Sequence, residues 1–302
     1  MARIPDFLIV GAAKSGTTSL WHYLRQHPDV FMPANKEPLY FAAPYYERMP
    51  DADPKAGLLR RCLVADWDAY LRLFEPAGDR RAAGEASQPY LYHHEITIPR
   101  IRERLGDPRI LIVLRNPVER AVSAYTFLVR DGEEPRSLDE CLDLEERRIR
   151  DGWSMSHFYR AAGLYAAQVK AYRDGFSRVG VWLYDDLKSD ASAFVRSLYE
   201  FLGVDPAFQP DVETRHNISG IPTNRLVLWA LRDTNPLRLA ARPFARLLFP
   251  EPVRRRIVEG LRARHTRRME VPPETRARLC ALFREDILRL QDTIGRDLSA
   301  WL

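Results

Sequence analysis

Short apolar runs alternate with amphipathic stretches along the chain. Three runs, Phe7–Val10, Arg109–Leu114 and Val179–Leu183, contain β-branched residues and are short enough to be single strands. Continuous apolar runs of this length are typical of strands buried on both faces of a sheet. The pattern therefore predicts three buried strands.

An amphipathic helix pattern follows each predicted strand. Strand–helix alternation of this kind predicts right-handed βαβ units and a parallel sheet covered by helices on both faces. Proline and glycine mark the helix ends, since proline fits a first turn and glycine fits a C-terminal cap. The predicted helices run from Thr17 to before Pro28, from Asn116-Pro117 to Gly132, and from Ser189/Asp190 to Gly203.

The remaining pattern adds a helical layer to one α/β domain. Apolar positions between Leu279 and Ile294 follow helical spacing, and Gly295 ends that stretch. The chain has 302 residues and shows no internal repeat. We therefore predict an α/β fold in a single domain, residues 1–302, with a central parallel sheet flanked by helices and a helical C-terminal layer from about residue 225.

Composition and the N-terminal sequence predict the cellular compartment of the protein. No apolar run approaches the ~18 residues that span a bilayer, and the N-terminus runs directly into a predicted strand, without room for a secretory signal. Three scattered cysteines, Cys62, Cys141 and Cys280, form no metal or redox spacing. These features predict a cytoplasmic protein without a transmembrane segment, and the arginine-rich composition is typical of a GC-rich bacterial genome.

The basic residues are unevenly divided. Only five are lysines, against 41 arginines, and the formal net charge is +5. Twelve of the arginines lie in residues 225–270, which raises the alternative of a protein that binds nucleic acid or an anionic surface. That stretch has few interleaved aromatic residues and no groove-reading motif. We therefore expect no nucleic-acid partner. Because lysine is rare in this chain, a lysine in a glycine-containing loop needs a chemical explanation.

The segment Gly11–Thr18 has the composition of an anion-binding loop. It connects the first predicted strand to the first helix and contains Lys14, Ser15, Gly16 and Thr17. Backbone N–H groups and a helix N-terminus converge on a phosphate in such a loop. The nucleotide P-loop has lysine directly after its second glycine, whereas here threonine follows Gly16 and the lysine lies inside the loop.

The end of the second strand distinguishes between nucleotide-binding classes. A P-loop NTPase has an aspartate there to hold magnesium, but this strand ends in Leu114-Arg115. Arginine repels a metal and binds an anion by paired hydrogen bonds. Ser123 follows on the polar side of the next helix. The residues predict a nucleotide with two anionic ends and no metal, with a magnesium-dependent P-loop small-molecule kinase as the alternative.

These motifs resemble those of sulfotransferases that use 3′-phosphoadenosine 5′-phosphosulfate (PAPS), in particular the bacterial and heparan-type carbohydrate branch. The similarity extends over the whole chain and implies the P-loop-NTPase-like sulfotransferase fold. One departure is Ala86, where the branch often has lysine. The resemblance rests on the segments Ala13–Leu20, Leu24–Val30, Lys36–Phe41, Gly84–Tyr90, Leu114–Tyr125, Gly163–Tyr165, Tyr184–Leu187, Phe201–Gly203 and Gly295–Trp301.

The resemblance implies a role for each candidate residue. Lys14 would neutralise charge on the leaving oxygen, while Ser15, Gly16, Thr17 and Thr18 hold the 5′-phosphate. Arg115 and Ser123 would hold the 3′-phosphate, and Tyr184 would contact the adenine. Glu37 is the expected general base, buried among Tyr40, Phe41, Tyr45 and Tyr46, with His93 or His94 as the alternative. The product would be adenosine 3′,5′-bisphosphate (PAP).

Two features of the site stay open at this level. A third cofactor loop should fall within residues 217–225, where Arg225 is a candidate, but its contacts cannot be assigned residue by residue. The acceptor would be a hydroxyl or amine of a carbohydrate, lipid or small natural product, and only analogy favours a carbohydrate.

Overall fold

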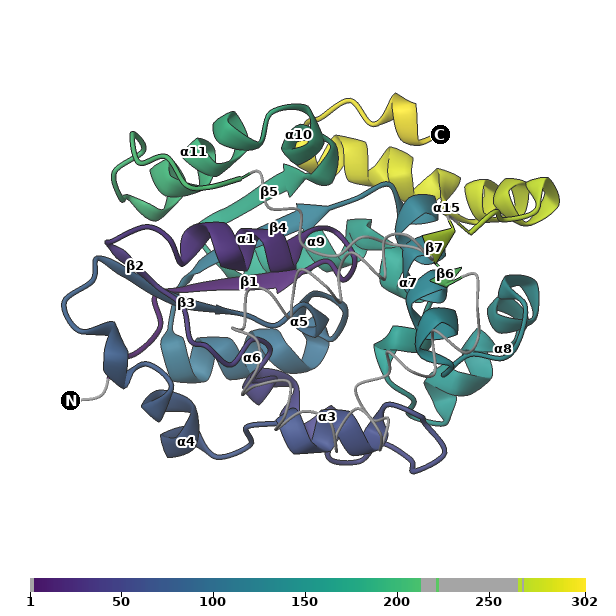
Figure 1. The fold of residues 1–302 in the computed structure, drawn as a ribbon, viewed down its shortest axis with the longest axis horizontal. Coiled ribbons are helices and arrows are strands. Elements are labelled where there is room, and N and C mark those ends of the chain that lie inside the picture. Colours follow the sequence, from purple (N-terminus) through teal and green to yellow (C-terminus); the bar gives the residue numbers. More distant parts are fainter. Residues whose placement is uncertain (1–2, 213–220, 223–265, 268) are drawn as a thin grey trace, which may run out of the picture.

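A five-stranded parallel sheet forms the centre of the protein (Figure 1). The computed structural model describes residues 3–212, 221–222, 266–267 and 269–302. The strands lie in the order β2-β3-β1-β4-β5. Their bounds are β1 Phe7–Gly11, β2 Val30–Phe31, β3 Ala82–Ala86, β4 Arg109–Leu114 and β5 Val179–Leu183. The three strands predicted from apolar runs are thus confirmed as β1, β4 and β5.

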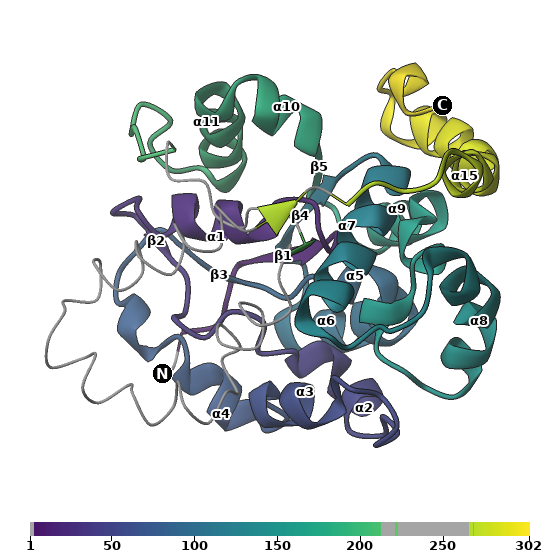
Figure 2. The ribbon, with the colours of Figure 1, turned by 45° about the vertical axis from the view of Figure 1, so that its right-hand side comes forward.

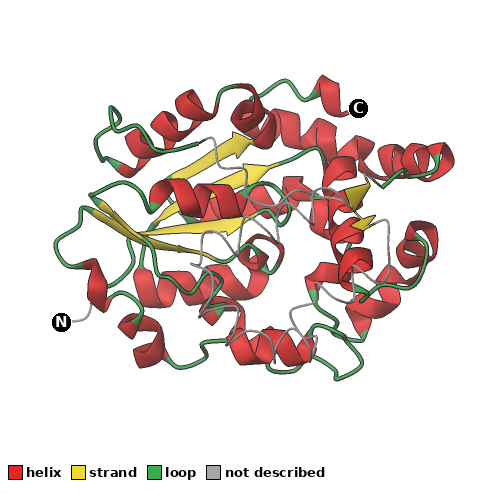
Figure 3. Ribbon diagram, viewed as in Figure 1, coloured by secondary structure: helices red, strands yellow, loops and turns green. Residues whose placement is uncertain are grey.

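Helices cover both faces of this sheet (Figure 3). The three helices predicted to follow strands are α1 (Thr17–Leu24), α7 (Pro117–Asp131) and α11 (Ala191–Leu202), and the predicted Gly132 and Gly203 caps adopt the left-handed conformation. The others before the C-terminal region are α2 Ala43–Tyr46, α3 Ala56–Cys62, α4 Trp67–Arg72, α5 Pro89–Tyr92, α6 His94–Leu105, α8 Leu138–Arg150, α9 Tyr165–Gly175 and α10 Tyr184–Ser189.

Alternate residues of β1 belong to two separate hydrophobic clusters, one on each face of the sheet. Phe7 and Ile9 of β1 pack with α1 and α11, whereas Leu8 and Val10 pack with the helices of the opposite face. Successive strand residues point to opposite faces, which explains the division. Figure 2 shows α10 and α11 on one side of the sheet, and α5 and α6 on the other.

Strand β3 was not predicted from the apolar pattern. Its sequence, Ala-Ala-Gly-Glu-Ala, has low strand propensity, although all five residues are buried. A Cβ at Gly84 would lie 2.4 Å from the Phe7 carbonyl oxygen, so only glycine fits this position. Close packing between β3 and β1 therefore selects small residues. Because small residues do not form an apolar run, the sequence pattern alone does not reveal this strand.

The C-terminal helix packs against α9 and α7. Helix α15 (Pro273–Ile294) ends at Gly295, as predicted. Its Asp286 carboxylate accepts hydrogen bonds from the backbone N–H groups of Tyr165 (2.6 Å) and Ala166 (3.2 Å), at the start of α9. Within the parts of the chain that the structure describes, no helix is long and apolar enough to cross a membrane.

Most of the arginine-rich segment lies outside the described residues. Strands β6 (Ile221–Pro222) and β7 (Thr266–Arg267) form a short antiparallel pair. Of the predicted third cofactor loop at residues 217–225, only the two residues of β6 are described. Arg225 and the predicted start of the helical layer near residue 225 lie outside the described residues.

Candidate active site

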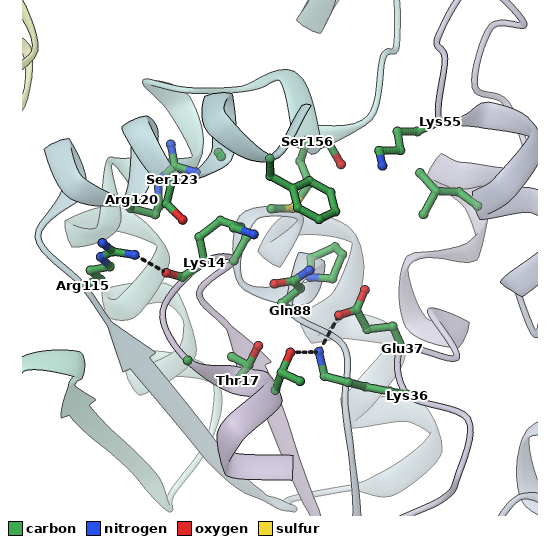
Figure 4. Close-up of a pocket in the computed structure, with 18 of the residues that line it drawn as sticks. Lys14, Thr17, Lys36, Glu37, Lys55, Gln88, Arg115, Arg120, Ser123 and Ser156 are labelled. Carbon is green, nitrogen blue, oxygen red and sulfur yellow. Dashed lines mark hydrogen bonds and ion pairs between the residues drawn. The ribbon is translucent and has the colours of Figure 1, made fainter. Parts of the chain in front are cut away.

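A cavity of about 360 Å³ opens where the strands end (Figure 4). The loop after β1, Gln88 after β3, Arg115 after β4 and Tyr184 after β5 all line it. In parallel α/β sheets, ligands bind in the crevice outside the carboxyl ends of the strands. The topology therefore brings residues from four chain segments to one place.

The loop after β1 presents the N-terminus of α1 to the cavity. Gly16 precedes the helix with φ +90°, and no side chain caps its first turn. Thr17, Thr18 and Ser19 line the cavity. An uncapped helix N-terminus directs N–H groups and a partial positive charge at an anion. A Cβ at Gly16 would lie 2.9 Å from the Tyr184 ring, so glycine lets the loop and that ring approach.

Lys14 lies at the centre of the cavity. Its Nζ is 4.1 Å from the centre of the Phe127 ring of α7. Burial, followed by the nearby Arg130 guanidinium, lowers the pKa of Lys14 to about 8. Its side chain therefore carries a positive charge at neutral pH and is held against an aromatic face.

Arg115 and Ser123 lie on one side of Lys14 (Figure 4). The Arg115 guanidinium donates to the Lys14 carbonyl oxygen (3.2 Å) and lies 5.2 Å from the Tyr184 ring. The Tyr165 hydroxyl in turn donates to the Arg115 carbonyl oxygen (3.1 Å). The guanidinium also lies 3.8 Å from the Glu119 carboxylate, and these contacts hold it at the strand end, beside the buried Ser123.

Arg120 is a site residue that the sequence interpretation missed. It is buried, donates to the carbonyl oxygens of Phe158 (3.2 Å) and Tyr159, and lines the cavity with Ser123. Its Nε has no hydrogen-bond partner among the described residues. Its position three residues before Ser123, on one helix face, was a usable signal, but arginine is too common in this chain to stand out.

Glu37 lies on the other side of Lys14 (Figure 4). Lys36 holds it there, because the Lys36 ammonium donates to Glu37 Oε1 (2.8 Å) and to Thr18 Oγ1 (3.2 Å). The Glu37 backbone N–H also donates to the Ala86 carbonyl oxygen (3.1 Å). Lys36, whose role the sequence left open, therefore ties the candidate base to the phosphate loop.

The structure separates some predicted residues from the cavity. Ser15 is buried and does not line it, so only its backbone could serve a bound phosphate. Of the four aromatic residues expected around Glu37, Tyr46 lines the cavity, whereas Tyr40, Phe41 and Tyr45 do not.

Neither alternative base reaches the cavity. His93 and His94 are absent from its lining. His93 is buried with its ring centre 4.1 Å from that of Tyr45, and burial lowers the pKa of His93 to about 3. The placement favours Glu37 over both histidines.

Lys55, which the sequence did not single out, is a further cavity residue. Its ammonium is 2.7 Å from Glu133 and 3.9 Å from Asp131. Three of the five lysines of the chain, Lys14, Lys36 and Lys55, thus line one cavity. The rarity of lysine was the signal that could have found the third.

Fold and site together define an α/β protein of the P-loop type, with a strand–loop–helix at the cavity and Arg115 at the strand end where a P-loop NTPase has a metal-binding aspartate. A family model described as the sulfotransferase family matches residues 5–210. The chain therefore belongs to the sulfotransferase family. It is also similar to the crystal structure of a sulfotransferase from Alicyclobacillus acidocaldarius, with a TM-score of 0.75, 38% identity and 99% of each chain covered.

Curated relatives match over part of their length. The heparan sulfate glucosamine 3-O-sulfotransferase 3A1 of Mus musculus is 28% identical over 208 residues, covering 67% of this chain and 46% of the relative. The membrane-associated sulfotransferase kil1 of Dictyostelium discoideum is 30% identical over 128 residues, covering 42% of this chain and 24% of the relative. The chain thus spans about a quarter to a half of these relatives.

These matches confirm the resemblance and the P-loop-like fold class predicted from the sequence. They favour neither the small-molecule kinase nor the protein that binds nucleic acid or anionic surfaces. The role of each site residue, the independence from metal and the cytoplasmic location stay predictions.

Proposed function

We propose that the protein transfers a sulfuryl group from PAPS to a hydroxyl or amine of an acceptor. One observation carries the proposal. A single cavity is lined by two groups of possible anion donors, Thr17 and Thr18 at the N-terminus of α1 and Arg115 with Ser123 on one side of Lys14, and by a carboxylate, Glu37, on the other side of Lys14. PAPS has two anionic ends, and its transfer reaction needs a base on the side away from the leaving group.

The residues of the cavity fit this donor. The uncapped N-terminus of α1, with Thr17 and Thr18, offers donors for a 5′-phosphate. Arg115 and Ser123 offer donors for a 3′-phosphate, and the unpartnered Nε of Arg120 adds positive charge beside them. Tyr184, which lies against both Gly16 and Arg115, would contact the adenine ring of the donor.

When bound, PAPS supplies an activated sulfuryl group whose leaving group is the 5′-phosphate of PAP. Lys14 would neutralise the charge that develops on the bridging oxygen, a contribution of about 2–4 kcal/mol for one preorganised donor. Glu37 would accept the proton of the acceptor hydroxyl or amine as its oxygen or nitrogen forms the new bond to sulfur. Positioning and charge, rather than covalent help from the protein, account for the catalysis.

No metal is assigned a role in this scheme. Arg115 occupies the strand end where a P-loop NTPase has its magnesium-binding aspartate. The acceptor class is proposed as a carbohydrate, lipid or small natural product, and relatives named for heparan sulfate are consistent with the first of these.

The role of Glu37 gives a direct test. Glu37→Gln removes the base but keeps its size, so we expect sulfuryl transfer from radiolabelled PAPS to fall by about 10²–10⁴-fold. PAP affinity, measured by calorimetry, should change less than twofold, because Arg115, Ser123 and the loop are intact. His94→Gln is the matched control and should retain activity. An active Glu37→Gln protein together with an inactive His93 or His94 variant would contradict the assignment.

A further inference from the structure

The cavity wall beyond Lys14 differs in kind from the wall around Arg115. Lys55 is the N-cap of α3, and Figure 4 shows it on the same side of Lys14 as Glu37. Helix α3 also contributes Leu58 and Leu59 to the lining, and Tyr46 and Met155 add two further apolar side chains. We name this part of the lining, with Lys55 and these four side chains, the acceptor end.

Leu58 is an exposed apolar side chain of this wall. It is 47% exposed, and among the described residues the other large exposed apolar side chains are Ile4, Leu288 and Leu302. Of these four, only Leu58 lines the cavity. Helix α3 packs Ala56 and part of Leu59 against the core, whereas Leu58 is not part of that core cluster. An apolar side chain at a cavity edge gains stabilisation when an apolar ligand covers it.

The charges at this end are already neutralised within the protein. Lys36 pairs with Glu37 at 2.8 Å, and Lys55 pairs with Glu133 at 2.7 Å and Asp131 at 3.9 Å. The Lys55 side chain is only 8% exposed. A sulfate or carboxylate of an acceptor would lose its hydration here and meet, at Lys36 and Lys55, ammonium groups that are already paired, which is unfavourable.

The walls of the acceptor end are held in place before any ligand binds. The buried Asp53 carboxylate accepts hydrogen bonds from the backbone N–H groups of Lys55 (2.7 Å) and Ser154 (2.5 Å). It thereby joins α3 to the turn that contains Met155 and Ser156. The four apolar side chains lie beside the polar Glu37, Gln88 and Ser156, which also line the cavity. A preformed wall of this kind selects its ligand by shape and by the placement of its apolar and polar surfaces.

We infer that the acceptor end takes an uncharged hydroxyl on an apolar body, such as an aryl or alkyl alcohol, and not a sulfated or carboxylated sugar residue. The assignment rests on the proposed function, of which it specifies the acceptor. The alcohol oxygen forms the new S–O bond while the bond from sulfur to the bridging oxygen of the donor breaks. The proton passes to Glu37, and PAP leaves.

Binding to the PAP-loaded protein tests this assignment without a turnover assay. The full chain is first titrated with PAP by calorimetry, and the loaded protein is then titrated with 2-naphthol and, separately, with a heparan sulfate tetrasaccharide. We expect 2-naphthol to bind at least tenfold more tightly than the tetrasaccharide. Leu58→Asp should weaken 2-naphthol binding at least tenfold and leave PAP binding unchanged. Leu288→Asp, at a similarly exposed leucine of α15, is the control and should change neither.

Each other result has a definite meaning. If PAP binds but the tetrasaccharide binds more tightly, or neither acceptor probe binds, the inference about the acceptor is overturned and the proposed function stands. Equal weakening by Leu58→Asp and Leu288→Asp would also overturn it. If PAP does not bind, the proposed function fails, and the acceptor assignment fails with it.

Discussion

Lys14 and Glu37, the two candidate catalytic residues, share an unusual backbone conformation. Their φ angles are +65° and +63°, and among the described residues Leu39 is the one other non-glycine residue with positive φ. Non-glycine residues in this region cost about 1 kcal/mol or more and cluster at functional sites. The fold therefore places both side chains at the cavity at a local cost in stability.

The ionisation of Lys14 predicts the pH dependence of the reaction. Because burial lowers the pKa of Lys14 to about 8, the cation is present below pH 8 and is lost as the pH rises through that value. We expect kcat/KM for PAPS, which reports the free enzyme, to decline above about pH 8. Lys14→Met should lower kcat/KM by about 10²–10³-fold and abolish this decline.

Lys170→Met is the matched control for this measurement. Lys170 is exposed on α9 and pairs with Asp174, so its loss should leave the profile unchanged. A wild-type profile that stays flat to pH 10 would show that the charge on Lys14 is not required.

At the residue scale, the sequence indicates which side chains reach the cavity where a residue type is rare or a motif is tight, while their roles stay predictions. Lys14, Gly16, Thr17, Thr18, Arg115, Ser123, Tyr184 and Glu37 all line the cavity. Arg120 was missed because arginine is abundant, and Lys55 because α3 reaches the site only through tertiary packing. The burial of Ser15 depends on how the loop packs against Tyr165, which spacing alone does not show.

Among the elements, β3 carries a buried carboxyl group that makes stability depend on pH. Burial raises the pKa of Glu85 to about 7, although Ser87 donates a hydrogen bond to it at 2.7 Å. The folded protein therefore holds this proton more tightly than the unfolded chain does. The resulting stabilisation is complete below the ordinary pKa of about 4.5 and is lost progressively as the pH rises through 7.

Glu85→Gln removes this titration. We expect the melting temperature of wild type to fall relative to that of Glu85→Gln between pH 5 and pH 8, by the equivalent of up to about 3 kcal/mol. Thermal unfolding across this pH range measures the difference. A difference between the two proteins that is constant with pH would show that Glu85 does not titrate in the folded state.

Helices and strands were predictable where local sequence carries a clear signal, and were missed where tertiary packing selects the residues. Strands β1, β4 and β5 are apolar runs and α1, α7 and α11 have proline or glycine at their ends, so local sequence identifies them. Strand β3 is alanine-rich because it packs tightly against β1, and α3 is short and mostly exposed. Neither has a periodicity that a single sequence could reveal.

At the scale of the whole molecule, parallel topology is what assembles the site. Four strand ends contribute the phosphate loop, Gln88, Arg115 and Tyr184, so predicting the sheet largely predicts which segments meet. The fold class and the family follow from the sequence for this reason. The acceptor end does not, because its side chains come from the connections between β2 and β3 and between α8 and α9, whose paths no local pattern specifies.

The central claim is that the cavity binds a twice-phosphorylated adenine nucleotide without metal. Calorimetric titration with PAP in EDTA, with 5′-AMP in EDTA and with Mg-ATP tests it most directly. We predict that PAP binds at least 100-fold more tightly than either of the others, and that Arg115→Ala reduces PAP affinity to near that of 5′-AMP. Arg289→Ala, an exposed arginine of α15, should have no effect. Tighter binding of Mg-ATP than of PAP would contradict the account.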